Sequence, residues 1–103
     1  MMPLLESNIN KIAELCKKYK VKELYVFGSI LTPRFTPESD IDLVAEFDRT
    51  GVDPENMADI FFGFIDDMEQ LFKRKIDLTE YSAIKNRFFK QEVDNTRQLL
   101  WTA

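Results

Sequence analysis

Three aspartates and a Gly-Ser pair stand out in this sequence because of their chemical types and their separations. Gly28-Ser29 is followed, after ten intervening residues, by Asp40 and Asp42, and Asp77 comes later in a similar apolar frame. Because side chains alternate faces along a strand, Asp40 and Asp42 should point the same way. Paired carboxylates offer the oxygen ligands that Mg²⁺ prefers. The spacing therefore predicts a cation site, with Asp77 as a third ligand if its strand lies beside that of Asp42.

Three converging carboxylates need compensation. Two like charges about 5 Å apart repel by about 3 kcal/mol at an effective dielectric near 20, so three together imply a bound cation, a basic neighbour or a raised pKa. Two Mg²⁺ ions bridging the aspartates, an attacking hydroxyl and an α-phosphate would form the clamp for in-line phosphoryl or nucleotidyl transfer. The turn at Gly28 would receive the terminal phosphates through main-chain N–H groups and the Ser29 hydroxyl.

Each part of this pattern alone is weakly specific. An isolated Asp-x-Asp also occurs in solvated loops, glycosyltransferases and calcium sites, although an EF-hand loop would need more spaced oxygens and a closing Glu. The combination of strand, Gly-Ser, ten residues, Asp-x-Asp on a second strand, helix and third Asp on a third strand is much more specific.

The apolar periodicity predicts the elements that position these residues. We expect helices over residues 4–19, 53–73 and 81–93, and strands over 23–27, 40–47 and 75–80. The strand over 40–47 is apolar on both faces, which is typical of a central strand covered by helices. Residues 96–103 fit either a helical continuation or a terminal strand. The 103 residues, with no repeat or linker, predict one domain spanning residues 1–103.

Composition excludes several classes of function. A net charge of -4 argues against a broad nucleic-acid surface or an anionic membrane surface. The single Cys16 excludes an internal disulfide, and the absence of His excludes histidine-based catalysis. No apolar run of about 18 residues and no secretion signal is present, so a soluble cytoplasmic protein is expected. The lysines over 17–22 suit a helix C-terminus, although they could instead meet a nucleotide or an acidic partner.

The motif VFGSILTPRFTPESDIDLV, followed by RKIDLTE, resembles the minimal nucleotidyltransferases of the DNA polymerase β superfamily. The resemblance implies an α/β (α+β) fold in which helices flank a small mixed sheet. It makes Gly28 and Ser29 the phosphate-binding turn and Asp40 and Asp42 the ligands of two Mg²⁺ ions that accompany a nucleoside triphosphate, with ATP expected. It makes Asp77 the third metal ligand, close to the acceptor hydroxyl.

The same resemblance implies a partner. Small members are often the antitoxin half of a toxin–antitoxin pair whose other half is a helical HEPN protein, and some transfer AMP onto a partner tyrosine. This sequence departs from relatives that carry Arg-x-Arg-Gly after Gly-Ser, because residues 30–33 are Ile-Leu-Thr-Pro. Arg34, which follows directly, is the expected nucleotide-binding substitute, and residues 73–75 (Lys-Arg-Lys) are further candidates.

Two hypotheses follow. In the first, the chain is a Mg²⁺-dependent enzyme that moves a nucleoside monophosphate to a protein or small-molecule hydroxyl. A protein partner or a second copy of the chain would then complete the part of the site that recognises the acceptor. In the second, it is a catalytically weak or inactive antitoxin that neutralises a helical toxin by binding it. A surplus of aromatic residues around Phe61 to Phe64, with Trp101, suggests a homodimer or partner contact.

Overall fold

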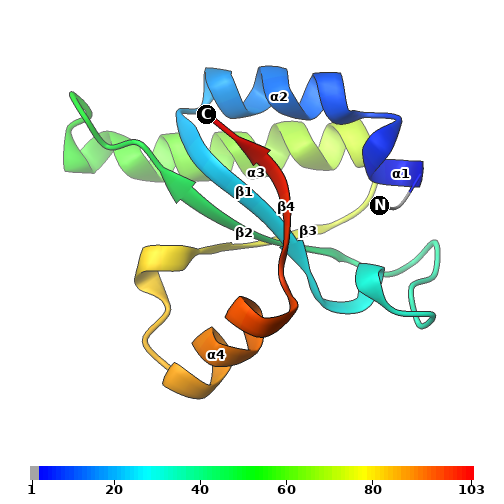
Figure 1. Cartoon of the computed structure of the whole chain (residues 1–103). Coiled ribbons are helices and arrows are strands. Elements are labelled where there is room, and N and C mark those ends of the chain that lie inside the picture. The colour runs from blue at the N-terminus through cyan, green and yellow to red at the C-terminus, as the bar shows by residue number, and fades with distance from the viewer. Residues whose placement is uncertain (1–2) are drawn as a thin grey trace.

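Four strands form one mixed sheet in the order β3-β2-β1-β4 in the computed structural model, which describes residues 3–103 (Figure 1). β1 pairs antiparallel with both β2 and β4, whereas β2 and β3 run parallel. The apolar segment expected over 40–47 is therefore a central strand, as predicted. The strands are β1 Val21–Phe27, β2 Ile41–Phe47, β3 Ile76–Glu80 and β4 Gln98–Thr102.

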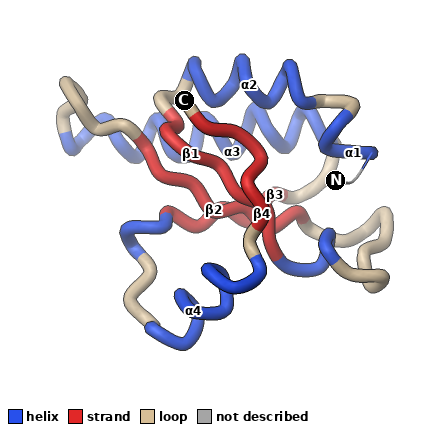
Figure 2. Tube along the Cα trace, viewed as in Figure 1, coloured by secondary structure: helices blue, strands red, loops and turns tan. Residues whose placement is uncertain are grey.

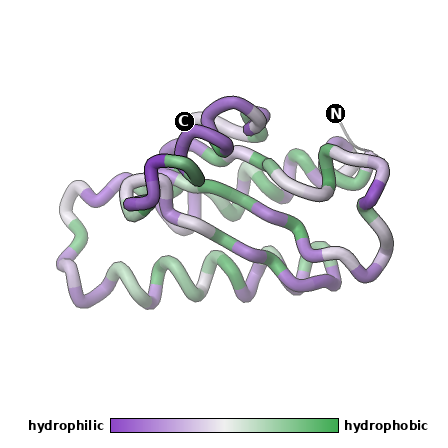
Figure 3. Tube along the Cα trace, turned by 90° about the horizontal axis from the view of Figure 1, so that it is seen from below, coloured by the Kyte–Doolittle hydropathy of each residue, from purple (hydrophilic) through white to green (hydrophobic). Residues whose placement is uncertain are grey.

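Helices lie on both faces of this sheet, which confirms the expected fold class (Figure 2). α2 and α3 cover one face, and α4 lies against the other (Figure 1). Hydropathy alternates along the helices, as it should in helices that bury one side (Figure 3). None of the helices within residues 3–103 is long and apolar enough to cross a membrane. They are α1 Pro3–Glu6, α2 Ile9–Lys18, α3 Met57–Phe72 and α4 Arg87–Thr96.

The main core lies between the sheet and the pair α2 and α3. Alternate residues of β2, such as Ile41 and Leu43, are fully buried there with Phe64 and Met68 of α3. Their neighbours in sequence face the side of the sheet on which α4 lies. This division matters for function, because it leaves the aspartates of β2 and β3 on the less covered face.

The helix expected over residues 4–19 is interrupted. The side chains of Ser7 and Asn8 both donate to the Leu4 carbonyl, at 3.4 Å and 2.9 Å, between α1 and α2. Such polar side chains compete with the main-chain bonds of a helix. The apolar spacing continues across the break, which explains why periodicity alone predicts one helix.

For the helix expected over residues 81–93, the predicted start is wrong. Residues Tyr81–Ala83 form a single 3₁₀ turn, and α4 begins only at Arg87. Its N-cap is Asn86, whose side-chain oxygen accepts hydrogen bonds from the amides of Phe88 and Phe89 at 2.9 Å and 3.1 Å.

The last stretch of the chain is a strand. β4 pairs with β1, so the strand alternative for residues 96–103 is correct. The helix expected over residues 53–73 also starts later than predicted, because Asp53 precedes a 3₁₀ turn, Pro54–Asn56, and forms no side-chain cap. It ends as expected, with Lys73 in the left-handed conformation at φ 54°.

The aromatic residues that suggested a homodimer are mostly used inside the chain. Phe64 is fully buried, and Phe61 and Trp101 pack against the main core. Only Phe62 of this group is largely exposed, at 61%. The sequence-based reason for a homodimer therefore loses most of its weight.

Candidate active site

Three segments that carry the predicted site residues meet at one end of the sheet. β1 ends where its antiparallel neighbour β2 begins, so Phe27 pairs with Asp42. β3 runs parallel to β2, and Asp77 pairs in register with Asp42. Residues paired in register point to the same face. The structure therefore brings the Asp42 and Asp77 carboxylates side by side on the face opposite the α2 and α3 core.

The Gly28 turn fits closely over this carboxylate pair. Gly28 has φ +78°, and a Cβ added there would clash with the Asp42 carboxylate, lying 3.0 Å from its Cγ. The chain then forms the 3₁₀ turn Gly28–Leu31, whose Ile30 is fully buried. Glycine is required here both for the left-handed backbone and for the close approach. The aliphatic residues after Gly-Ser anchor the turn to the core.

Asp42 has the perturbed electrostatics of the site. Its pKa is raised, chiefly by burial and then by the charges of Asp77 and Asp40, while hydrogen bonding from the Ser29 amide opposes the rise. The ionised carboxylate is therefore under electrostatic stress that a cation would relieve. The Ser29 amide faces the position where this negative charge lies.

The site residues offer the carboxylate oxygens that a divalent cation prefers. Their side chains are not arranged as a complete set of metal ligands within residues 3–103. Asp40 lies one residue before β2 and close enough to influence the charge state of Asp42. Within residues 3–103, no group of three or more Asp, Glu or Cys side chains is arranged to hold a metal ion. The in-register Asp42 and Asp77 form the best-defined part of the site, and Asp40 stands at its margin.

The basic residues expected to replace the missing arginines are not gathered at the turn. Arg34 is exposed, and its main-chain amide donates to the Thr32 hydroxyl at 3.2 Å. Arg74 is directed to main-chain carbonyls of the loop before β2. Lys73 and Lys75 are exposed. In the described part of the chain, the groups left at the Gly28 turn that could bind an anion are its main-chain amides and the Ser29 hydroxyl.

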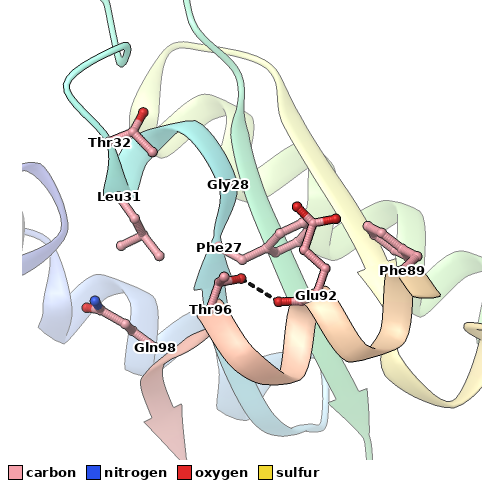
Figure 4. A pocket seen from close by; sticks show the side chains of 8 residues that line it. All are labelled: Phe27, Gly28, Leu31, Thr32, Phe89, Glu92, Thr96 and Gln98. Carbon is pink, nitrogen blue, oxygen red and sulfur yellow. Dashed lines mark hydrogen bonds between the residues drawn. The ribbon is translucent and has the colours of Figure 1, made fainter. Parts of the chain in front are cut away.

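A pocket of about 450 Å³ opens beside the Gly28 turn, between the end of β1 and α4 (Figure 4). Its wall from α4 was not predicted from the sequence, although Phe89, Glu92 and Thr96 have the spacing of one helix face. The Glu92 carboxylate points toward the strand end that carries Phe27 and Gly28. The pocket is lined by Phe27, Gly28, Leu31, Thr32, Phe89, Glu92, Thr96 and Gln98.

Aromatic and ionic contacts hold α4 under the sheet. The Arg97 guanidinium lies 4.0 Å from the Tyr25 ring centre and 4.9 Å from that of Tyr81. The Tyr81 hydroxyl donates to Asp94 at 2.7 Å, which raises the pKa of Tyr81. Phe89 packs edge-on against Phe27, with ring centres 6.0 Å apart. These contacts set the position of the pocket wall relative to the Gly28 turn.

Comparison with known proteins gives consistent results. Residues 10–103 match the family model described as Polymerase beta, Nucleotidyltransferase. MJ0128 of Methanocaldococcus jannaschii, which is named provisionally as a protein adenylyltransferase, is 38% identical over 80 residues. This match covers 78% of the present chain and 76% of MJ0128.

Several solved structures share the fold. A chain from the crystal structure of a toxin–antitoxin with AMP-PNP has a TM-score of 0.69 and 22% identity, covering 93% of the present chain and 74% of its own. A chain from the complex of a tri-AMPylated HEPN toxin with MNT antitoxin of Shewanella oneidensis has a TM-score of 0.64 and 22% identity. The coverage there is 96% of the present chain and 73% of the other. At this level of identity, the likeness shows the fold.

Proposed function

Because the chain belongs to the polymerase β nucleotidyltransferase family, we propose that it transfers AMP from ATP to a protein hydroxyl in a Mg²⁺-dependent reaction. The observation that carries this proposal is the in-register pair Asp42 and Asp77 beneath the Gly28 turn. A carboxylate pair next to the main-chain amides of a short turn can serve a cation and a phosphate chain at the same place. The names of the related proteins support adenylyl transfer to protein as the reaction.

The proposal gives each residue a role. Asp42 and Asp77, with Asp40, would hold the Mg²⁺ ions, which supply charge neutralisation at the transferring phosphate. The amide of Ser29 and its hydroxyl would orient the terminal phosphates. Asp77 is exposed and lies at the open side of the pair, where it would accept the proton of the attacking hydroxyl.

The atoms balance in this scheme. The acceptor oxygen forms a bond to the α-phosphorus of ATP, and the bond from that phosphorus to the bridging oxygen of pyrophosphate breaks. Pyrophosphate leaves with the electron pair of that bond. The acceptor's proton passes to Asp77 and from there to water. The products are the AMP ester of the acceptor and pyrophosphate.

The pocket beside Gly28 is the proposed site for the uncharged part of the nucleotide. Its lining is mainly apolar and includes the Phe27 and Phe89 rings, which suits a flat base. The Glu92 carboxylate would repel phosphate but can accept hydrogen bonds from a ribose hydroxyl or an amino group of a base. The phosphate chain would therefore run away from α4, toward Asp42.

The proposed acceptor is a helical HEPN-type protein, which makes the chain the antitoxin of a pair. Support comes from the fold neighbours, which include a HEPN toxin in complex with MNT antitoxin. Fold alone does not decide function, so the acceptor must be tested directly. A small helical protein, if a neighbouring reading frame encodes one, is the acceptor to try first.

The test is a transfer assay with ATP labelled in its α-phosphate. Wild-type protein, Mg²⁺ and the candidate acceptor should give a labelled acceptor, and chelation of Mg²⁺ should prevent labelling. Asp42→Asn should reduce labelling by at least about a thousandfold, the scale of losing essential electrostatic stabilisation of a transition state. Asp66→Asn, which removes a carboxylate exposed on α3, is the matched control and should label normally. Equal labelling by both variants would refute the proposed site.

A second candidate function is binding without catalysis. The feature that favours it is the aliphatic turn after Gly-Ser, where Ile30 is buried at a position for which the resemblance implies a basic residue. In that case wild type and Asp42→Asn would neutralise the helical toxin equally, and neither would label it.

A further inference from the structure

Arg74, which lies between α3 and β3, holds the loop that leads into Asp40. Its guanidinium Nη1 donates to the carbonyl of Thr36 at 3.2 Å and to the carbonyl of Ser39 at 3.0 Å. The same guanidinium lies 4.6 Å from the ring centre of Phe35. One side chain therefore contacts both ends of the turn that immediately precedes Asp40.

Hydrogen bonds within the turn also help to fix it. The Thr36 amide donates to the Ser39 hydroxyl at 3.0 Å, and the hydroxyl oxygens of Thr36 and Ser39 lie 3.1 Å apart. The amide of Ser39 donates to the Thr36 carbonyl at 3.0 Å, which closes the turn on itself. Thr36, Pro37 and Glu38 are exposed to solvent. Because the Ser39 carbonyl belongs to the peptide unit that joins Ser39 to Asp40, its orientation affects where the Asp40 side chain points.

Arg74 itself is well placed to act as an anchor. It follows directly after Lys73, whose left-handed conformation ends α3. The next residue, Lys75, is bonded to the start of β2, because the Ile41 amide donates to the Lys75 carbonyl at 3.1 Å. Glu69 adds a further tie by accepting a hydrogen bond from the Ile76 amide at 3.0 Å. The segment that carries Arg74 is therefore joined to the starts of both β2 and β3.

We propose that Arg74 is a positioning residue, which orders the turn over residues 36–39 and so presents Asp40 to the cation held by Asp42 and Asp77. The cation in this statement rests on the proposed function. Arginine suits the role better than lysine, because its planar fork can donate to carbonyls while its face stacks on an aromatic ring.

The first experiment measures hydrogen exchange in the metal-free protein. Arg74→Ala should raise the exchange rates of the Ser39 and Ile41 amides by at least about tenfold, the scale of losing hydrogen bonds from a charged donor. Amides of β4, such as Leu99, should be unaffected. Lys75→Ala is the matched control, since it removes the same charge from the adjacent residue but keeps the main-chain bond to Ile41. Exchange that is equal in both variants, or raised throughout the chain, would overturn the proposed ordering role.

The second experiment measures binding of Mn²⁺, as a spectroscopic substitute for Mg²⁺, from the electron paramagnetic resonance signal of the free ion. Arg74→Ala should weaken Mn²⁺ binding by roughly tenfold, about 1.4 kcal/mol, and Arg74→Lys should fall between it and wild type. Lys75→Ala should bind like wild type. Faster exchange over residues 36–41 with unchanged Mn²⁺ binding would overturn the link to Asp40.

The two experiments separate this proposal from the proposed function. Failure of the wild-type protein to bind Mn²⁺ in the presence of ATP would refute the metal site and with it the presentation of Asp40 to a cation. Exchange at Ser39 and Ile41 would still decide whether Arg74 orders the turn. If Arg74→Ala raised the KM for ATP without changing the affinity for Mn²⁺, Arg74 would instead contact the nucleotide, and its positioning role would be overturned.

Discussion

Replacing Asp42 with Asn should make the metal-free protein more stable while it removes the response to Mg²⁺. Asp42 is partly buried and lies in register with Asp77, and its pKa is raised by burial and by the neighbouring carboxylates. A raised pKa means that the folded state disfavours the ionised form. Asparagine has the same shape and keeps an oxygen that can accept from the Ser29 amide.

The size of the effect can be worked out from the strand geometry. Adjacent strands lie about 4.8 Å apart, so the two carboxylates repel by about 0.9 kcal/mol at the dielectric of water and by about 3.5 kcal/mol at an effective dielectric of 20. Asp77 is exposed, which favours the lower end of this range. A gain of about 1 kcal/mol corresponds to a rise in Tm of about 4–8 °C for a domain of this size.

Thermal unfolding followed by circular dichroism at pH 7, with and without Mg²⁺, measures both effects. Asp42→Asn should unfold at a higher temperature than wild type in chelator, and its Tm should change much less than that of wild type when Mg²⁺ and ATP are added. Asp66→Asn should resemble wild type in both conditions. A Tm of Asp42→Asn below that of wild type in chelator would contradict the electrostatic account of the pair.

Further predictions follow from individual contacts. The pKa of Asp42 is raised above its ordinary value of 3.8, so the metal-free protein should lose stability as the pH rises from 3.8 through the raised pKa. Urea titrations at several pH values measure this dependence, and Asp42→Asn should make the free energy of unfolding depend less on pH. Gly51→Ala, at φ +73° in open space, should lower the free energy of unfolding by about 1 kcal/mol from backbone strain alone. Gly28→Ala should lower it further, because the added Cβ meets Asp42, and should abolish ATP binding measured by calorimetry. Cys16 is fully buried with its pKa raised to about 12, so an aromatic disulfide reagent should label it only after unfolding. Asn86→Ala should destabilise the protein by about 1 kcal/mol and, by loosening α4, raise the KM for ATP in the transfer assay.

The sequence predicts the central part of the fold well because its signals there are local. The apolar run of β2 and the glycine at position 28 depend on burial and backbone geometry that a few neighbouring residues determine. The register of Asp42 with Asp77 follows the hydrophobic pattern, since a shift of one residue would expose Ile41 and bury charge.

The parts that were not predicted depend on contacts between distant segments. The chain over residues 81–86 has a helical pattern, yet Tyr81 is drawn into a stack with Arg97 and the helix starts only after the Asn86 cap. The position of α4 across the sheet is set by this stack and by β4, so the pocket beside Gly28 has no signature in the local sequence. Arg74 is a similar case, because its partners lie 38 and 35 residues earlier in the chain.

A crystal structure with Mn²⁺ and a non-hydrolysable ATP analogue would test the proposed metal and phosphate site, with anomalous scattering used to locate the metal. We expect an anomalous peak in contact with carboxylate oxygens of both Asp42 and Asp77, and the analogue's phosphates against the Ser29 amide. Manganese bound elsewhere, or an analogue whose phosphates avoid the Gly28 turn, would contradict the proposed site.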